Sequence, residues 1–287
     1  KKTPARKIIT FKDAFAGRST MMAEITENAA YKVGLPNYNE VLRLPFGNKN
    51  ASKALGLAQE YVAANENNIC CFVFEPMLGE GGYRVANSEF FLPLLKFFRD
   101  QKIPIWADEI QTFSRTGELF AFETLGIGEF VDVCTIAKTA QLGVTLYTEE
   151  MNPKPGLIAG TFSGGTSDLL AGMEIIKMIV NEGYLGHDGK IAHIHKSFIG
   201  MLNQLNATTC KGLLNDAEGL GLMIAVTPYD GSKEKTDALL KRLYQNHLIA
   251  FGCGHDPYRV RFLIPAVMTE RDILIAEKII EKSVLEG

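Results

Sequence analysis

Three short, predominantly apolar runs constrain the fold of this chain more than any other feature. They occupy residues 69–74, 103–107 and 131–137. Apolar runs of this length are typical of strands that are buried on both faces of a parallel sheet. Segments with helical spacing precede the first run, at residues 51–65, and separate it from the second, at residues 88–100. Because strands alternate with helices, we predict a mostly parallel α/β sheet with right-handed crossovers.

The pattern changes after residue 184, where shorter strands are mixed with amphipathic helices. We expect helices at about residues 191–205, 233–246 and 270–286, and strands at about residues 219–227, 248–251 and 258–263. This mixture is typical of a small α+β domain. We therefore predict a large domain over residues 1–184 and a small C-terminal domain over residues 185–287.

Composition excludes several classes of partner. The formal net charge of −3 provides no basic surface for nucleic acid. No apolar run approaches the length of a membrane span. The five cysteines are odd in number and lack CxxC spacing, so we expect free thiols in a reducing compartment. These features predict a cytoplasmic protein that acts on small molecules.

Charged residues follow the three apolar runs, where ligands bind in open α/β sheets. Glu75 follows the first run, Asp108 the second and Lys138 the third. Taken alone, Lys138 is best explained as a surface residue, because buried lysines are rare. Together, a lysine that binds an aldehyde and an acid that keeps a ring nitrogen protonated indicate pyridoxal phosphate chemistry. Thr161, in a glycine-rich loop, is a candidate donor to the phosphate.

Five segments then resemble one known family, in the order in which that family carries them. They are Phe-Ala-Gly-Arg at 15–18, Glu-Pro-Met-Leu-Gly-Glu-Gly-Gly at 75–82, the stretch 106–121, Ile-Ala-Lys at 136–138 and Gly-Thr-Phe-Ser-Gly at 160–164. This set is similar to the class III, or omega-type, aminotransferases. The resemblance implies fold type I, dependence on pyridoxal 5'-phosphate and a homodimer. The family includes acetylornithine, ornithine, 4-aminobutyrate and lysine aminotransferases.

The resemblance also implies a role for each matching residue around the cofactor. Lys138 matches the lysine that binds the cofactor and later moves the substrate proton, and Asp108 matches the acid that pairs with the pyridinium. Gln111 matches the glutamine that bonds the ring oxygen. Phe15 matches the aromatic residue that stacks on the ring, and Gly17 would let the backbone approach it.

Further matches concern the phosphate and the substrate. Ala16 stands where the family usually has a histidine, and Thr161 matches a phosphate-binding threonine lent by the other subunit, so the dimer would share its active site. Arg261 matches the arginine that clamps the α-carboxylate of 2-oxoglutarate or glutamate, and Glu80 matches the glutamate that pairs with it when an ω-amine is bound. Glu75 is either a carboxylate near the substrate or a strand-end cap.

These matches predict an enzyme of amino-acid metabolism, a transaminase that moves an amino group from an ω-amino or acetylornithine-like donor to 2-oxoglutarate. An aminomutase or a decarboxylase of the same family is the alternative. The family's N-terminal region has no counterpart here, so we expect an incomplete large domain. A catalytically silent, truncated paralogue that acts by dimerisation is therefore a further alternative.

Two other kinds of site are disfavoured by spacing. His193 and His195 lie two residues apart on a predicted helix, where side chains point in different directions, so we expect no metal site. No GxGxxG motif follows the first predicted strand, which argues against a dinucleotide-binding enzyme.

Overall fold

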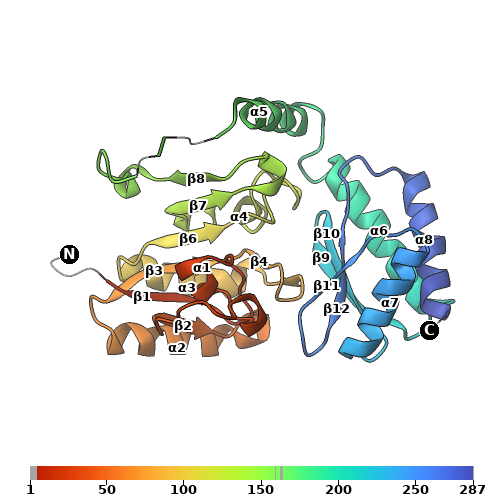
Figure 1. The fold of residues 1–287 in the computed structure, drawn as a ribbon, viewed down its shortest axis with the longest axis horizontal. Helices are drawn as coiled ribbons and strands as arrows, with labels where there is room; N and C mark the ends of the chain where they lie inside the picture. Colours follow the sequence, from red (N-terminus) through yellow and green to blue (C-terminus); the bar gives the residue numbers. More distant parts are fainter. Residues whose placement is uncertain (1–4, 159, 162–163, 287) are drawn as a thin grey trace. The chain divides into compact units, whose positions relative to one another are not determined.

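The computed structural model describes residues 5–158, 160–161 and 164–286, which form two compact units (Figure 1). The first unit comprises Lys1–Pro76, Ala86–Phe113 and Phe120–Ile179. The second comprises Met77–Val85, Ser114–Leu119 and Val180–Gly287. The chain thus enters the second unit twice before it remains there. The predicted assignment of residues 1–184 to a cofactor-binding domain stays a prediction.

The first unit is built on a six-stranded sheet in the order β2-β1-β3-β6-β7-β8. Its strands are β1 (Lys7–Phe11), β2 (Val41–Leu44), β3 (Ile69–Phe74), β6 (Ile105–Asp108), β7 (Val133–Ile136) and β8 (Val144–Tyr147). All neighbours pair in parallel except β7 and β8, which are antiparallel. The predicted parallel α/β sheet is therefore confirmed. The edge strand β8 was not predicted, because its side chains are mostly exposed and form no apolar run.

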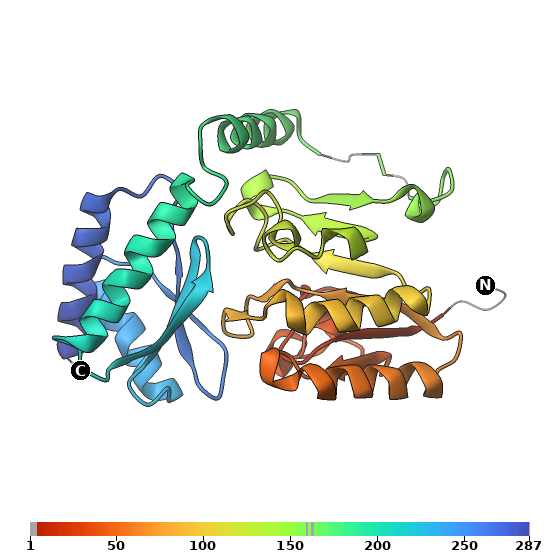
Figure 2. The ribbon, with the colours of Figure 1, turned by 180° about the vertical axis from the view of Figure 1, so that it is seen from behind.

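An aromatic core joins this sheet to helix α3 (Ser88–Asp100), which lies with helix α2 (Ala51–Ala64) on one face of the sheet (Figure 2). Phe72 of β3 stacks on Phe98 of α3, with ring centroids 4.6 Å apart. Aromatic pairs at this distance add stability beyond their buried area. The N-cap of α3 is Asn87, whose side chain accepts a hydrogen bond from the Phe90 amide at 3.2 Å.

The remaining helical elements of the first unit include one that the sequence pattern did not indicate. Helix α1 lies in a stretch that is rich in Gly, Pro and Asn, which we expected to be mostly irregular. The helical segments are α1 (Thr20–Ile25), α4 (Ala121–Thr124), α5 (Thr166–Asn181) and the 3₁₀ turns η1 (Ala29–Tyr31), η2 (Asn48–Asn50), η3 (Gly128–Phe130), η4 (Lys138–Ala140) and η5 (Glu149–Met151). Helix α5 packs closely against η4 at Gly172. A Cβ added at this glycine would be only 2.4 Å from the Ala140 carbonyl oxygen.

The second unit has a four-stranded antiparallel sheet in the order β11-β12-β10-β9, with three helices on one face (Figure 1). Its elements are α6 (Lys190–Ala207), β9 (Leu214–Leu220), β10 (Met223–Pro228), α7 (Lys233–Gln245), β11 (Phe251–Cys253), β12 (Arg259–Leu263) and α8 (Glu270–Leu285). The single strand expected at 219–227 is in fact parts of β9 and β10. Gly221, with φ +53°, makes the turn, and a Cβ there would be 2.0 Å from the Arg115 carbonyl oxygen.

A short hairpin packs against the other face of this sheet. It consists of β4 (Met77–Leu78) and β5 (Arg84–Val85), which pair in antiparallel fashion. A buried cluster joins the hairpin to the sheet and contains Met77, Tyr83, Met223, Ala225 and Cys253. These two-residue strands therefore form because of tertiary packing, and no local sequence pattern indicates them.

Two kinds of feature are absent from the described ranges. Within residues 5–158, 160–161 and 164–286, no helix has the length and apolar character that a bilayer crossing requires. The same part of the chain holds no group of three or more His, Cys, Asp or Glu side chains that could bind a metal ion. The cysteines are free thiols.

Candidate active site

Lys138 follows β7 and begins the short turn η4. Its φ is +53°, a left-handed conformation that is uncommon for a residue with a side chain. The side chain is exposed within this unit, so it carries no cost of burial. Lys138 is thus held at the carboxyl end of a central strand by a strained backbone, with its amine accessible.

Asp108 is the last residue of β6, which pairs directly with β7. Only 8% of its surface is exposed, and its Oδ1 accepts a hydrogen bond from the Ile110 amide at 3.1 Å. Burial raises the pKa of Asp108 to about 6, against the opposing effects of the Ile110 amide and the positive charge of Lys138. A buried carboxylate of this kind is stabilised by a cationic partner. The protonated nitrogen of a pyridine ring is such a partner.

Glu109, the next residue, is fully buried and shapes the loop that carries Gln111. Its carboxylate accepts hydrogen bonds from the Thr112 hydroxyl and, at 2.9 Å, from the Phe122 amide. Burial raises the pKa of Glu109 to about 7. Gln111 lies half-buried in this loop, three residues after Asp108. Glu109 therefore acts on the structure of the loop.

Glu75 directly follows β3, and its carboxylate accepts a hydrogen bond from the Phe15 amide at 3.0 Å. The side chain is buried, with 7% of the residue exposed. The contact gives Glu75 a role in holding the segment that carries Phe15, while contact of Glu75 with a substrate stays a prediction. Ala16 and Gly17 follow in the same segment, and their amides are bound by Thr26. Sequence reasoning missed Thr26, which lies in the stretch expected to be irregular.

Thr161 is exposed, and only part of the segment around it lies within the described residues. Residues Ala159, Phe162 and Ser163 of the same glycine-rich segment lie outside the described residues. The predicted role of Thr161 at the phosphate therefore stays a prediction.

The second unit brings Glu80 and Arg261 together. Arg261 lies in β12, opposite Ala225 of β10, and Glu80 lies between the two strands of the hairpin. The Nη2 atom of Arg261 is 2.7 Å from Oε1 of Glu80. Only 11% of the Arg261 side chain and 21% of the Glu80 side chain are exposed. The Gly254 amide donates to the Glu80 carbonyl at 2.8 Å, which fixes the backbone at Glu80.

The surroundings of Arg261 strengthen this ion pair. Burial lowers the pKa of Arg261, but Glu80 and Tyr83 more than offset this effect, and the net pKa is raised. The guanidinium carbon also lies 5.5 Å from the centroid of the Tyr83 ring, within reach of a cation–π interaction. A partly buried pair of this geometry differs from a surface ion pair, which contributes little.

The first unit thus has a lysine and a buried acid at neighbouring strand ends, an arrangement found in cofactor-dependent enzymes of the α/β class. Comparison with protein families identifies which class. The family model of class-III aminotransferases matches residues 1–284. The chain therefore belongs to the class-III aminotransferase family, whose members depend on pyridoxal phosphate.

Individual relatives agree with this membership. The chain is 31% identical to a 4-aminobutyrate aminotransferase of Mycobacterium bovis, over 94% of this chain and 65% of the relative. It is 30% identical to an acetylornithine aminotransferase of Lactococcus lactis, over 96% of this chain and 70% of the relative. The chain thus spans about two thirds of the length of these curated relatives.

Solved structures confirm the predicted fold type I. A lysine aminotransferase from M. tuberculosis superimposes with a TM-score of 0.90 over 99% of this chain and 67% of that chain, at 22% identity. A transaminase from the marine bacterium Virgibacillus gives a TM-score of 0.87 at 19% identity. At these identities the likeness concerns the fold.

Proposed function

We propose that this chain takes part in a transamination from an ω-amino or acetylornithine-like donor to 2-oxoglutarate. The observation that carries the proposal is the ion pair of Glu80 and Arg261 at 2.7 Å. An arginine is permanently charged and binds carboxylates with a fork of N–H donors. The names of the matched relatives, 4-aminobutyrate and acetylornithine aminotransferase, support both kinds of donor.

The ion pair offers a physical basis for accepting two kinds of substrate. When a donor presents its ω-amine and no α-carboxylate, Glu80 neutralises Arg261. When glutamate or 2-oxoglutarate enters, its carboxylate replaces Glu80 on the guanidinium. The exchange is favourable only if the carboxylate of the substrate binds at least as well as Glu80, which bidentate contact allows.

Pyridoxal phosphate, when bound, supplies an aldehyde for amines and a ring that withdraws electrons from the donor carbon. The residues of this chain fit that group, because the Asp108 carboxylate is buried at the end of β6 and Lys138 follows the neighbouring strand β7. Lys138 would bind the aldehyde and, once released, hold at Nζ the proton taken from the donor carbon. Asp108 would keep a proton on the ring nitrogen.

The other matched residues would position the cofactor. Phe15 would stack on the ring, with Ala16 and Gly17 continuing the same segment, and Gln111 would donate to the ring oxygen. Thr161 would bind the phosphate from the partner subunit. These positions follow from the motifs, and the described contacts of Phe15, Ala16 and Gly17 support them.

We also propose a homodimer, in the cytoplasm, with residues 1–184 as the cofactor-binding domain and residues 185–287 as the small domain. Exposed apolar side chains on α5 support a protein partner for this helix. They include Leu169, Leu170 and Met173, each between 44% and 56% exposed. The free thiols support a reducing compartment.

A donor panel tests the proposal. The chain, supplied with pyridoxal phosphate and 2-oxoglutarate, is offered 4-aminobutyrate, acetylornithine, ornithine and lysine, and glutamate formation is measured. We expect glutamate from at least one of these donors. Product formation without any need for 2-oxoglutarate would instead favour the aminomutase or decarboxylase alternative. Absence of both, with cofactor bound, would favour the catalytically silent alternative.

A further inference from the structure

The segment Phe15–Ala16–Gly17, here called the ring-stacking loop, is held by side chains through its amides. The Phe15 amide donates to Glu75 Oε1 at 3.0 Å. The Ala16 and Gly17 amides both donate to the hydroxyl oxygen of Thr26, at 3.0 and 3.2 Å. Gly17 has a φ of +132°, a conformation that L side chains rarely adopt. The shape of this loop therefore depends on two buried side chains.

The hydroxyl of Thr26 uses its full hydrogen-bonding capacity. Besides accepting from the two amides, it donates to the Gly17 carbonyl at 2.7 Å. A hydroxyl has one donor and two acceptor positions, so all three are occupied. Thr26 is fully buried, at 0% exposure, and water cannot replace these bonds without a change in packing.

Thr26 is itself firmly anchored at the end of α1. Its amide donates to the Met22 carbonyl at 3.0 Å, and its carbonyl accepts from Lys32 Nζ at 2.9 Å. Arg43 of β2 donates to the carbonyls of Ile25 and Glu24, each at 2.8 Å. These bonds join the residue to the central sheet, so the hydroxyl has a fixed position from which to orient the loop.

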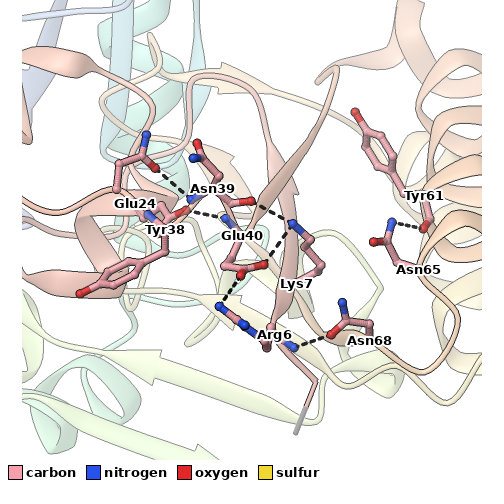
Figure 3. Close-up of polar contacts among 10 residues, drawn as sticks. Arg6, Lys7, Glu24, Tyr38, Asn39, Glu40, Tyr61, Asn65 and Asn68 are labelled. Carbon is pink, nitrogen blue, oxygen red and sulfur yellow. Dashed lines mark hydrogen bonds and ion pairs between the residues drawn. The ribbon is translucent and has the colours of Figure 1, made fainter. Parts of the chain in front are cut away.

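The chain that follows Thr26 returns to β1, which it contacts through Glu40 (Figure 3). The Glu24 carboxylate accepts the amides of Tyr38 and Glu40, at 3.1 and 2.7 Å. Glu40 pairs with Arg6 at 2.8 Å and with Lys7 of β1 at 3.0 Å. The hydrogen bond from Lys7 lowers the pKa of Glu40, which keeps this pair charged at neutral pH. The end of the excursion at Glu40 is thereby tied to β1.

We infer that Thr26 is a positioning residue, which orients the ring-stacking loop for the cofactor. The inference rests on the proposed function for the role of Phe15, whereas the contacts of the loop stand on their own. Tyr31 adds an edge-to-face contact to Phe15, with ring centroids 5.5 Å apart and planes at 85°. Glu75 and Tyr31 restrain Phe15 at its amide and its ring, and Thr26 restrains the two residues that follow.

The consequence for the cofactor is one of orientation. Stacking is sensitive to the distance and tilt between two rings. If the Thr26 hydroxyl is removed, the Ala16 and Gly17 amides lose their acceptor in a partly buried site. The loop can then satisfy them only by moving, and it carries Phe15 with it. Thr26 therefore contributes to cofactor affinity without touching the cofactor.

The test uses the whole chain with Thr26→Val, which keeps the shape and removes the hydroxyl, and Thr26→Ser, which keeps the hydroxyl. Thr227→Val is the matched control, because the buried Thr227 hydroxyl has no hydrogen-bond partner within the described ranges. The first readout is amide hydrogen exchange of Ala16 and Gly17 in the absence of cofactor. The second is the affinity for pyridoxal phosphate, from the absorbance change on titration.

We expect Thr26→Val to speed exchange at both amides and to weaken cofactor affinity, each about tenfold, because each of the two amides loses one buried hydrogen bond. Thr26→Ser should restore both values and Thr227→Val should leave both unchanged. If Thr26→Val does not fold, Thr26→Ala serves, since it also removes the hydroxyl and leaves room for water.

Two results overturn the inference. One is unchanged exchange at Ala16 and Gly17 in the valine or alanine variant. The other is faster exchange with wild-type cofactor affinity. Failure of the wild-type chain to bind pyridoxal phosphate would instead contradict the proposed function, and the exchange measurement would still decide whether Thr26 holds the loop.

Discussion

The first unit places Asp108 and Lys138 at the ends of neighbouring strands, whereas the second unit joins Glu80 directly to Arg261 at 2.7 Å. In the first unit burial dominates, and the pKa of Asp108 rises to about 6 although Lys138 opposes it. In the second unit the partner dominates, and the pKa of Arg261 is raised despite burial. On the proposed function, a cationic ring would complete the first site by stabilising its buried acid, and a competing carboxylate would open the ion pair of the second site.

Removal of the amine at Lys138 has the largest expected effect on this comparison. Lys138→Ala should lower transaminase turnover by at least about 1,000-fold, because it removes both the attachment point and the proton carrier. The absorbance of the bound cofactor should change with it. Lys53→Ala, at an exposed position on α2, is the control and should behave as wild type. Turnover at the wild-type level in Lys138→Ala would rule out the assigned role.

Asp108→Asn tests whether the first site is electrostatically incomplete. With cofactor present, we expect turnover to fall about 100-fold, because a neutral amide no longer holds the ring proton. The variant should retain its fold, since Asn can still accept the hydrogen bond from the Ile110 amide. A turnover equal to that of the wild type would show that the carboxylate does not act on the ring.

The same variant makes a prediction for the chain without cofactor. The folded-state pKa of about 6 lies above the ordinary value of 3.8 for an aspartate, so the folded state binds the proton more tightly than the unfolded state. The free energy of unfolding should therefore fall as pH rises from about 4 to about 7, by roughly 3 kcal/mol from this group. Asp108→Asn should remove that part of the slope, while the part from Glu109 remains. Denaturant unfolding of the wild type and of Asp108→Asn at pH 4 and pH 7.5 measures this difference. If both proteins lose the same free energy of unfolding between the two pH values, the burial argument is contradicted.

Glu80→Ala tests the completeness of the second site. Without Glu80, Arg261 lacks its partner when an ω-amine is bound and lacks a competitor when glutamate is bound. We expect the ratio of kcat/KM for glutamate over that for the ω-amino donor to rise about tenfold. Glu234→Ala, at an exposed position in the first turn of α7, is the matched control. An unchanged ratio in Glu80→Ala would remove the proposed switch.

The smallest expected effect concerns Tyr83, which lies under Arg261. Burial raises the pKa of its hydroxyl to about 12, and this hydroxyl has no hydrogen-bond partner within the described part of the chain. Tyr83→Phe should keep the ring contact to Arg261 and stabilise the chain by about 1 kcal/mol, because an unsatisfied buried group is removed. Thermal unfolding measures the change, and a clear loss of stability would show that the hydroxyl is bonded.

The sequence predicted the strand ends of the first unit well, for a simple physical reason. Strands buried on both faces are continuous apolar runs, so the polar residues that follow them stand out, as Asp108 and Lys138 do. The resemblance to class III aminotransferases then supplied Arg261 and Glu80, which no periodicity indicates. The structure adds that these two side chains are in contact.

The misses have a common cause, which is that tertiary contacts decide them. Hairpin β4–β5 forms because Met77 and Tyr83 pack into a sheet whose strands lie far along the chain. Thr26 was missed because its hydroxyl bonds amides nine and ten residues away, in a stretch without periodicity. The turn between β9 and β10 could have been found, since Gly221 interrupts the apolar run at that point.

The central claim is that Lys138 binds the cofactor, and reductive trapping tests it most directly. The chain is incubated with pyridoxal phosphate, reduced with borohydride, digested and analysed by mass spectrometry for a stable cofactor adduct on lysine. The account predicts one dominant adduct, on the peptide that contains Lys138, and its loss when an amino donor is added before reduction. An adduct spread over other lysines, or none at all, would contradict it.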